Sequence, residues 1–300
     1  MDALFTGFKR NFEKGLESVS TEYLSYSTVV PSNTSIETYP FLEKFGGMSE
    51  WLTDRQIKNV ASKKLELKNR KFEDTVALRR EDVEDDQYGI YAPVMQEMGF
   101  AAANLWGELA VEALYSGAVD TWIDDKTFFA TDHAYGSNTI NNKTTSALSS
   151  STYAAARLAM LSYKGHNDRA LKVLPNLLIV GPALEATAFD ILQQELVIDS
   201  AATGGTTDYV GGAIRNRWRG TAKYIVLPEL TGTYANYWFM CDVSRPLKPV
   251  VVQQRMMPKL TKKDNETDDN VFDEDVYKYG TRARGAAVLT MPHLIYGGIV

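Results

Sequence analysis

A single long helix decides the fold of this chain, and the stretch that carries it, from residue 87 to residue 117, is QYGIYAPVMQEMGFAAANLWGELAVEALYSG. Pro93 suits a first helical turn, where its missing hydrogen-bond donor is not needed. After Pro93, apolar residues recur at steps of three and four and predict one buried row of Val94, Met98, Ala102, Leu105, Leu109 and Ala113. About 25 helical residues at ~1.5 Å each make a rod of roughly 38 Å. Nothing on it suggests chemistry, so we interpret it as a structural spine.

A second row on the same helix consists of small residues, namely Gly99, Ala103 and Gly107. A glycine costs ~1 kcal/mol of intrinsic helix stability relative to alanine. Two glycines at this spacing therefore predict that another backbone packs closely against the spine.

The composition indicates a folded protein with a substantial core. The 300 residues are 44% hydrophobic and 11% aromatic, enough for one large domain or two of ordinary size. The formal net charge of -6 argues against tight nucleic-acid binding, so we expect nearby DNA to be enclosed rather than gripped. Cys241 is the only cysteine, which excludes an internal disulfide. We find no signal peptide and no apolar run of membrane-spanning length.

The first residues predict an amphipathic helix that ends near Leu16. Phe5, Phe8 and Phe12 fall on one face of it and need an apolar partner, supplied either by this chain or by another chain. Residues 18–38 are rich in Ser and Thr and have no helical period, so we expect an extended arm.

A charged ribbon precedes the spine. Residues 55–86 contain nine Lys or Arg and eight Asp or Glu, with isolated apolar residues among them. Leu65 and Leu67 alternate with charges before Lys68, and Phe72, Val76 and Leu78 follow a period of two, which predicts a hairpin turning at residues 68–71. Such a hairpin either lies solvated on a large sheet or reaches onto a neighbouring subunit, and we favour the second interpretation.

The rest of the chain predicts a second region of α/β character. We expect helices over residues 153–164, with Leu158 and Leu161 inward, and over residues 184–196. Expected strands cover residues 177–180, 222–227, 237–240, 250–252, 275–279 and 286–290, with an acidic loop at 262–270. The glycines in residues 204–212 predict a flexible loop, because no P-loop lysine follows them.

No residue pattern supports catalysis, a cofactor or a metal. Asp132 and His133 are the most plausible acid and base, but adjacent side chains usually point apart and no nucleophile elbow accompanies them. We expect them to organise a loop. His166 and His293 stand alone, and one cysteine makes no zinc site.

Two groups of arginines need a separate interpretation. Arg215, Arg217 and Arg219 surround Trp218, a mixture found on single-stranded nucleic acids. On alternating strand positions they would share one face and serve carboxylates of a neighbouring subunit equally well, which we favour. Arg282 and Arg284 are interpreted as a strand with ion-paired edges.

Five strings, in this order and spacing, resemble one known family. They are residues 3–8 (ALFTGF), 80–86 (REDVEDD) with 88–93 (YGIYAP), 129–133 (FATDH), 279–285 (YGTRARG) and 291–297 (MPHLIYG). The family is the major head subunit of Mu-like phages, often called gpT. The resemblance covers nearly the whole chain.

The resemblance implies an α+β fold of the Hong Kong 97 capsid type, in which an N-terminal arm and an E-loop embrace neighbours, a peripheral domain carries the spine helix, and an axial domain meets its copies at the capsomer centre. The corresponding segments are 1–38 for the arm, 39–54 for the start of the peripheral domain, 55–86 for the E-loop, 87–172 for the peripheral domain with the spine, 173–240 for the axial domain and 241–300 for the return to the peripheral domain.

The resemblance also implies a function and partners. The protein would be a non-enzymatic, self-assembling shell subunit of the virion, made and assembled in the cytoplasm of a bacterial host, that forms hexamers and pentamers around double-stranded DNA. A separate scaffold protein, a portal and decoration proteins are the further partners. We expect the scaffold to be a separate protein because no long charged helix precedes Phe5. The alternatives are an encapsulin-like nanocompartment and an α+β enzyme using Asp132 and His133. The interface residues that we predict are Phe5, Phe8, Phe12, Lys68, Arg70, Lys71, Phe72, Arg215, Arg217 and Arg219.

Overall fold

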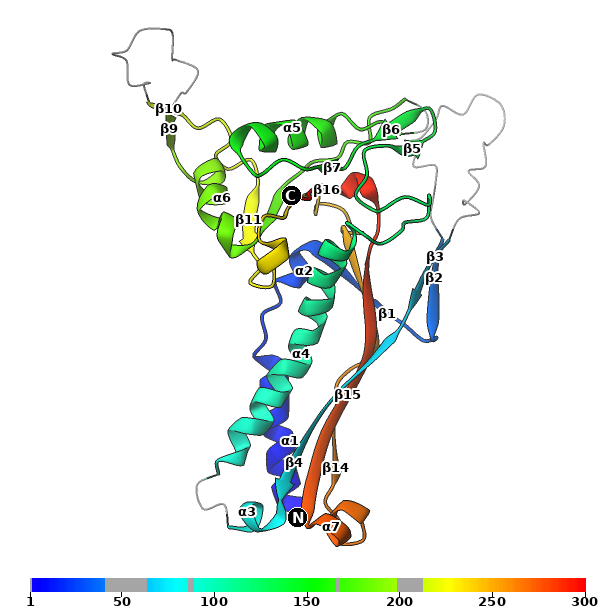
Figure 1. The fold of residues 1–300 in the computed structure, drawn as a ribbon, viewed down its shortest axis with the longest axis vertical. Coiled ribbons are helices and arrows are strands. Elements are labelled where there is room, and N and C mark those ends of the chain that lie inside the picture. Colours follow the sequence, from blue (N-terminus) through cyan, green and yellow to red (C-terminus); the bar gives the residue numbers. More distant parts are fainter. Residues whose placement is uncertain (1, 41–63, 86–88, 166–167, 199–212) are drawn as a thin grey trace. The chain divides into compact units, whose positions relative to one another are not determined.

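The computed structural model describes residues 2–40, 64–85, 89–165, 168–198 and 213–300. They fold into two compact units, each of which is drawn from separate parts of the chain (Figure 1). Unit 1 comprises Met1–Thr38, Glu66–Glu112 and Val251–Val288, and unit 2 comprises Tyr39–Leu65, Ala113–Val250 and Leu289–Val300. The predicted division into peripheral and axial domains is a finer statement and stays a prediction.

Unit 1 combines helices with one long sheet. Its helices are α1 (Asp2–Glu17), α2 (Tyr23–Tyr26), α3 (Arg80–Glu84), α7 (Asp269–Glu274) and most of α4 (Tyr91–Ser116). The sheet order is β1-β13-β15-β14, and β4 also pairs with β15. Its strands are β1 (Ser27–Pro31), β4 (Arg70–Arg79), β13 (Val250–Met256), β14 (Leu260–Lys263) and β15 (Val276–Leu289). Strands β2 (Ile36–Pro40) and β3 (Lys64–Lys68) pair with each other.

The spine helix is confirmed, since α4 extends without a break from Tyr91 to Ser116. The predicted buried row is right at Met98, Leu109 and Ala113 but wrong at Val94, which is 37% exposed. Met95, one residue later, is fully buried instead. The reason is that α1 packs against the side of α4 that carries Gly99, which turns Met95 inward and Val94 outward.

The close backbone approach is confirmed at Gly99 and wrong at Gly107. A Cβ on Gly99 would lie 2.9 Å from the carbonyl carbon of Phe12 and closer still to its oxygen. From the other side, a Cβ on Gly15 would lie 2.8 Å from the amide nitrogen of Phe100. Helices α1 and α4 therefore cross in backbone contact, whereas a Cβ on Gly107 would meet nothing within 4 Å among the described residues.

The N-terminal helix finds its apolar partner inside unit 1. Phe8 and Phe12 are 4% and 1% exposed, and they belong to a cluster that also contains Met95, Met98, Leu78, Val83, Leu260, Val271, Tyr277 and Tyr279. This corrects the alternative in which another chain covers these rings. The residues after α1, where the sequence predicts an extended arm, form the short helix α2 and the extended strands β1 and β2.

The hairpin predicted around residues 68–71 is wrong. Strand β4 pairs along ten residues with β15, from Arg79 opposite Val276 to Arg70 opposite Gly285, while β3 pairs with β2. Asn69, between β3 and β4, is buried and donates hydrogen bonds to the Ser32 hydroxyl and the Thr34 carbonyl, both at 2.9 Å. These long-range bonds hold the expected turn in the interior, so β4 is part of the core of unit 1.

Unit 2 is built around a mixed sheet in the order β11-β8-β12-β16-β7. Strands β8 and β11 are parallel, as are β16 and β7, whereas β12 is antiparallel to both of its neighbours. The sheet strands are β7 (Lys143–Thr144), β8 (Leu177–Val180), β11 (Lys223–Val226), β12 (Trp238–Cys241) and β16 (Ile295–Gly298). Two small ribbons complete the strands, β5 (His133–Tyr135) with β6 (Asn138–Ile140), and β9 (Leu196–Ile198) with β10 (Ala213–Arg215).

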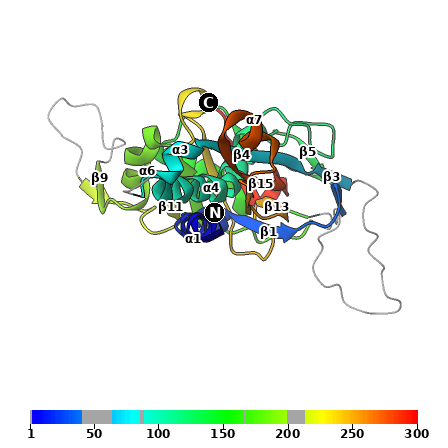
Figure 2. The ribbon, with the colours of Figure 1, turned by 90° about the horizontal axis from the view of Figure 1, so that it is seen from below.

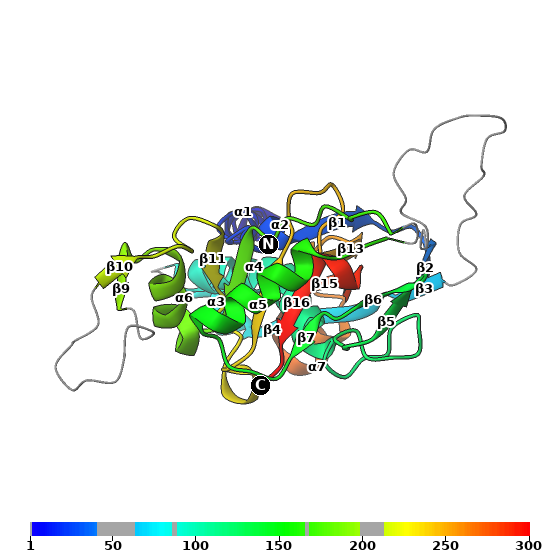
Figure 3. The ribbon, with the colours of Figure 1, turned by 90° about the horizontal axis from the view of Figure 1, so that it is seen from above.

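Two helices enclose the core of unit 2 with this sheet (Figure 3). Helix α5 (Ser150–Leu161) begins at a capping box made by Ser149 and Thr152, and α6 (Glu185–Leu192) is shorter than predicted. Short 3-10 turns lie at Pro182–Leu184, Gly232–Tyr234 and Pro292–Leu294. The buried side chains of α5 are Tyr153, Ala156 and Met160, so the prediction that Leu158 and Leu161 point inward is wrong.

The remaining strands agree with the sequence in position and differ in length. The strands predicted at 177–180, 222–227 and 237–240 are present as β8, β11 and β12. The two predicted at 275–279 and 286–290 form one strand, β15, because neither Gly280 nor Gly285 interrupts it. The expected loop at 262–270 includes the end of β14 and the start of α7. The predicted glycine loop at 204–212 lies outside the described residues.

Candidate subunit interface

The paired strands β4 and β15, with β14 beside them, have one covered and one bare face. Along β4, Lys71, Glu73, Thr75, Ala77 and Arg79 are exposed, while Phe72 and Val76 are partly buried and Leu78 is buried. Along β15, Tyr277, Tyr279, Thr281 and Ala283 are buried. Because directly opposed residues of an antiparallel pair share a face, the register places these buried side chains together, facing α1 and α4.

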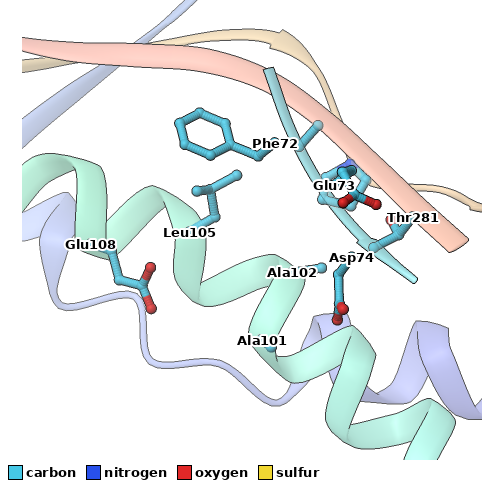
Figure 4. Close-up of a pocket in the computed structure, with 10 residues that line it drawn as sticks. Phe72, Glu73, Asp74, Ala101, Ala102, Leu105, Glu108 and Thr281 are labelled. Atoms are coloured by element: carbon cyan, nitrogen blue, oxygen red, sulfur yellow. The ribbon is translucent and has the colours of Figure 1, made fainter. Parts of the chain in front are cut away.

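The covered face contains a depression between β4, β15 and α4 (Figure 4). Its volume is about 270 Å³, and its apolar lining comes from Phe72, Ala101, Ala102, Leu105, Pro258 and Ala283. Figure 4 shows Phe72 lying over Leu105, with the carboxylates of Asp74 and Glu108 on either side of them. Its polar lining consists of Glu73, Asp74, Glu108 and Thr281.

One end of unit 1 is strongly acidic. Helices α3 and α7 lie at the same end of the sheet, where β4 runs into α3 (Figure 1, Figure 2). Arg80 joins them, because its guanidinium lies 2.8 Å from Glu84, 3.9 Å from Glu266 and 4.0 Å from Asp275. The hydrogen bond that Arg80 donates to Glu84 lowers the pKa of Glu84 and raises the pKa of Arg80. We call this region the acidic end, with carboxylates at Glu81, Asp82, Glu84, Asp85, Glu266, Asp268, Asp269, Asp273, Glu274 and Asp275.

The interface residues predicted near the N-terminus have different environments. Phe8 and Phe12 lie in the core of unit 1, and their rings are covered by the chain itself. Phe5 is partly buried, stacks on Tyr279 with ring centroids 6.4 Å apart, and has the Lys262 ammonium 4.9 Å above its ring. The three phenylalanines therefore stabilise the subunit.

The structure separates the predicted interface residues of the ribbon onto the two faces of the sheet. Arg70 lies on the covered face, forms a bidentate ion pair with Glu112 of α4 and has its guanidinium 5.2 Å from the Phe72 ring. It therefore attaches β4 to the spine. Lys71 projects from the bare face, and Lys68 is exposed in β3.

The arginines after the glycine loop do not share a strand face. Arg215 ends β10, whereas Arg217 and Arg219 lie in the following turn, which corrects the alternating arrangement. Asn216 causes the turn, because its amide donates to backbone carbonyls at the end of α6, those of Asp190, Ile191 and Gln194. All three arginines are exposed, and Arg219 lies 3.5 Å from Glu195.

Arg282 and Arg284 are confirmed as strand residues, on the bare face of β15. The ion pairs expected at them are wrong, because neither arginine has a carboxylate partner within the described parts of the chain. The Arg282 guanidinium lies 3.6 Å from the sulfur of Met256, and the Nε of Arg284 is buried without a hydrogen-bond partner among the described residues.

Asp132 and His133 point to different partners, as expected for neighbouring residues. His133 is 2% exposed, and its ring nitrogens lie 2.6 Å from Asp124 and 2.9 Å from the Phe128 carbonyl oxygen. Asp132 instead accepts a hydrogen bond from Lys126 at 2.6 Å, which lowers its pKa. Both side chains fix the loop between α4 and β5, and the histidine has its two nitrogens occupied.

Other kinds of site are not formed by the parts of the chain that the structure describes. In these ranges no three His, Cys, Asp or Glu side chains gather as metal ligands. None of the helices described combines the length and the apolarity that crossing a membrane requires. Exposed leucines on α5, Leu158 at 67% and Leu161 at 43%, are surface features that the helical period had placed inside.

Several solved structures share the fold of this chain. The procapsid protein of bacteriophage JBD30 is 27% identical, and the match covers 99% of this chain and 73% of that chain with a TM-score of 0.60. A virus-like particle from Pyrococcus furiosus matches with a TM-score of 0.55 at 10% identity, covering 97% of this chain and 96% of that chain. The SrpI encapsulin of Synechococcus elongatus matches with a TM-score of 0.53 at 9% identity, covering 94% of this chain and 88% of that chain. At such low identity the last two show the fold alone.

Sequence relatives distinguish a phage head from a nanocompartment. The Mu-like prophage FluMu major head subunit of Haemophilus influenzae is 28% identical over 98% of this chain and 72% of its own length. The major capsid protein of Escherichia phage Mu is 27% identical over 95% of this chain and 68% of its own length. The model of one family matches residues 1–152, 141–230 and 229–298. The chain therefore belongs to the Mu-like prophage major head subunit gpT family and is a major capsid protein of a tailed phage, with the Hong Kong 97 capsid fold.

Proposed function

We propose that this protein forms the head as hexamers and pentamers of its own copies, held together partly by the bare face of the β4, β15 and β14 sheet. The observation that carries this proposal is that α1 and α4 cover one face of the sheet, while the other face carries exposed charged side chains such as Lys71, Glu73 and Arg282. Polar rims of interfaces set register and partner choice through such charges.

The shell encloses DNA without reading its sequence and performs no reaction. A net charge of -6 repels a polyanion as a whole, so confinement needs no sequence-specific contact. The chemical candidates support the same conclusion, because His133 has both nitrogens occupied and Cys241 is fully buried with a pKa raised chiefly by that burial. Assembly takes place in the cytoplasm of a bacterial host.

Further proteins complete the head. A separate scaffold protein directs curvature, a portal occupies one vertex, and decoration proteins bind the finished surface. A JBD30 capsid of this fold is described as decorated with minor capsid protein trimers, which supports the last of these partners.

The experiment is to express the chain together with the head-assembly genes of its phage and to separate the lysate by sedimentation. We expect megadalton particles that appear as closed shells by negative-stain microscopy and that protect double-stranded DNA from nuclease when packaging proteins are present. A subunit that sediments only as a monomer or small oligomer under all these conditions would refute the proposed assembly.

A further inference from the structure

The bare face of the sheet is cationic although the chain is acidic. The register of β15 with β4 and β14 places six cations on it: Lys71, Arg79, Lys263, Lys278, Arg282 and Arg284. Glu73, opposite Arg282, is the anion among the paired residues of this face. We call these residues the cationic face, and it belongs entirely to unit 1.

Like charges stand directly opposite each other at two places on this face. Lys71 of β4 is opposite Arg284 of β15, and Lys263 of β14 is opposite Lys278 of β15. Opposed like charges destabilise an antiparallel pair. Lys278 is compensated by Glu274 at 2.8 Å, but Lys71 and Arg284 have no carboxylate partner among the described residues. The chain itself therefore leaves the Lys71 and Arg284 pair unneutralised.

The surface that complements this pair is present on the same chain. The acidic end carries ten carboxylates, nine of them on exposed residues, with Arg80 among them and Lys278 beside Glu274. It cannot reach Lys71 within one subunit, since Lys71 and Arg79 are eight residues apart along β4, roughly 27 Å at ~3.4 Å per residue. A second copy, at the high local concentration of an assembling shell, can bring the two surfaces together.

We propose that the cluster of Lys71, Arg282 and Arg284 on the cationic face of one subunit binds the acidic end, formed by α3 and α7, of a neighbouring subunit. This inference rests on the proposed assembly of the protein from its own copies, and it specifies one of the interfaces in that assembly. Because it joins two different surfaces, it is heterologous: each subunit donates an acidic end and accepts another, as closed rings require. Its ion pairs bring carboxylates to opposed cations that repel each other in the free subunit.

The first test uses a zero-length carbodiimide, which joins an amine to a carboxylate only when they touch, on intact wild-type particles. We expect peptides that link Lys71 to a carboxylate in 81–85 or 266–275. Such a link must join two subunits because the intrachain distance is roughly 27 Å. Particles that form normally but give no Lys71 link to these segments would overturn the proposal.

The second test is a charge exchange. Reversal of the face in K71E/R284E and of the acidic end in D269K/D273K should each lower particle yield by about tenfold or more, and combining the four changes should restore most of it, since charge pairs across an interface set partner choice. Lys223→Glu in unit 2, an exposed lysine whose reversal changes the charge by half as much as K71E/R284E, is the control and should assemble normally. Circular dichroism of each subunit confirms folding, and K71Q/R284Q gives a milder version of the same defect.

The outcomes separate the possible explanations. If the wild type forms no shells, the proposed function fails. If it does form them, normal assembly of K71E/R284E or folded variants without rescue in the combination overturns this contact alone. Shells of K71E/R284E that form in normal yield but lose packaged DNA assign the face to nucleic acid, and that result also overturns the proposal.

Discussion

The crossing of α1 and α4 makes a sharp prediction about two glycines of the same helix. Gly99→Ala should destabilise the subunit although alanine gains ~1 kcal/mol in helix propensity. Its new Cβ would lie 2.9 Å from the Phe12 carbonyl carbon, and a backbone atom cannot move aside by changing rotamer. Overpacking typically costs ~1–3 kcal/mol, and we expect the upper end here because separating the helices also loosens Phe8 and Phe12. The net loss is about 2 kcal/mol.

Gly107→Ala is the matched control for this change. Its Cβ would meet nothing within 4 Å among the described residues, so the propensity gain of ~1 kcal/mol should remain as added stability. The unfolding free energies of the two variants should therefore differ by about 3 kcal/mol. We expect Tm to rise by roughly 2 to 4 °C in Gly107→Ala and to fall by roughly 4 to 8 °C in Gly99→Ala. Urea unfolding of the unassembled subunit, followed by tryptophan fluorescence, measures the difference. Equal stabilities of the two alanine variants would refute the close crossing.

Two further predictions concern acid. Burial, with Arg245 as the next cause, lowers the pKa of His293 from 6.5 to about 3, so the folded state binds fewer protons than the unfolded state. The stability contributed by the neutral imidazole is therefore complete above pH 6.5 and falls as the pH drops toward 3. The urea midpoint of His293→Gln should depend less on pH across that window. Hydrogen bonds from the Asn33 amide, the Ser32 hydroxyl and the Thr34 amide lower the pKa of Glu37 from 4.5 to about 2. The contribution of the Glu37 carboxylate to folding stability is therefore present above pH 4.5 and lost as the pH falls to 2. A carbon-13 NMR titration midpoint near 4.5 would contradict these bonds.

The helices of this protein were predictable because their signals are local. The row of apolar residues after Pro93 identified α4, and the phenylalanine spacing identified α1 and its end near Leu16. Periodicity finds an amphipathic face only to within one residue of rotation, which explains the error at Val94. It also misplaced Leu158 and Leu161, since the buried side chains of α5 are Tyr153, Ala156 and Met160.

Strand partners were beyond the sequence because pairing depends on distant segments. The alternation of Phe72, Val76 and Leu78 correctly predicted a half-buried strand, but the same pattern fits pairing with β3 or with β15. The deciding contacts come from Asn69, whose side chain meets Ser32 and also Gln253 at 2.8 Å, 184 positions away. A polar residue flanked by lysine and arginine gave no sign that it would be buried.

The candidate interface depends on the register for the same reason. Charge counting in residues 55–86 found nearly equal numbers of cations and anions and thus no preferred surface sign. The pairing of β4 with β15 determines which charged side chains lie on the same face of the sheet. Only this register places Lys71 directly opposite Arg284. The sequence predicts Lys71 as an interface residue, which stays a prediction, and it predicts ion pairs at Arg284 that the described residues do not form.

The net charge of the chain hides the separation of its charges within unit 1. The Lys71 end of the cationic face and the acidic end are roughly 27 Å apart along β4, whereas the Debye length is ~10 Å at 0.1 M salt. At that separation the two surfaces do not neutralise each other within one subunit. A partner surface that is attracted to one of them is also not repelled by the other. Each surface is therefore open to a neighbour, and assembly should weaken as salt rises, since the contacts between the subunits are exposed charge pairs until they close.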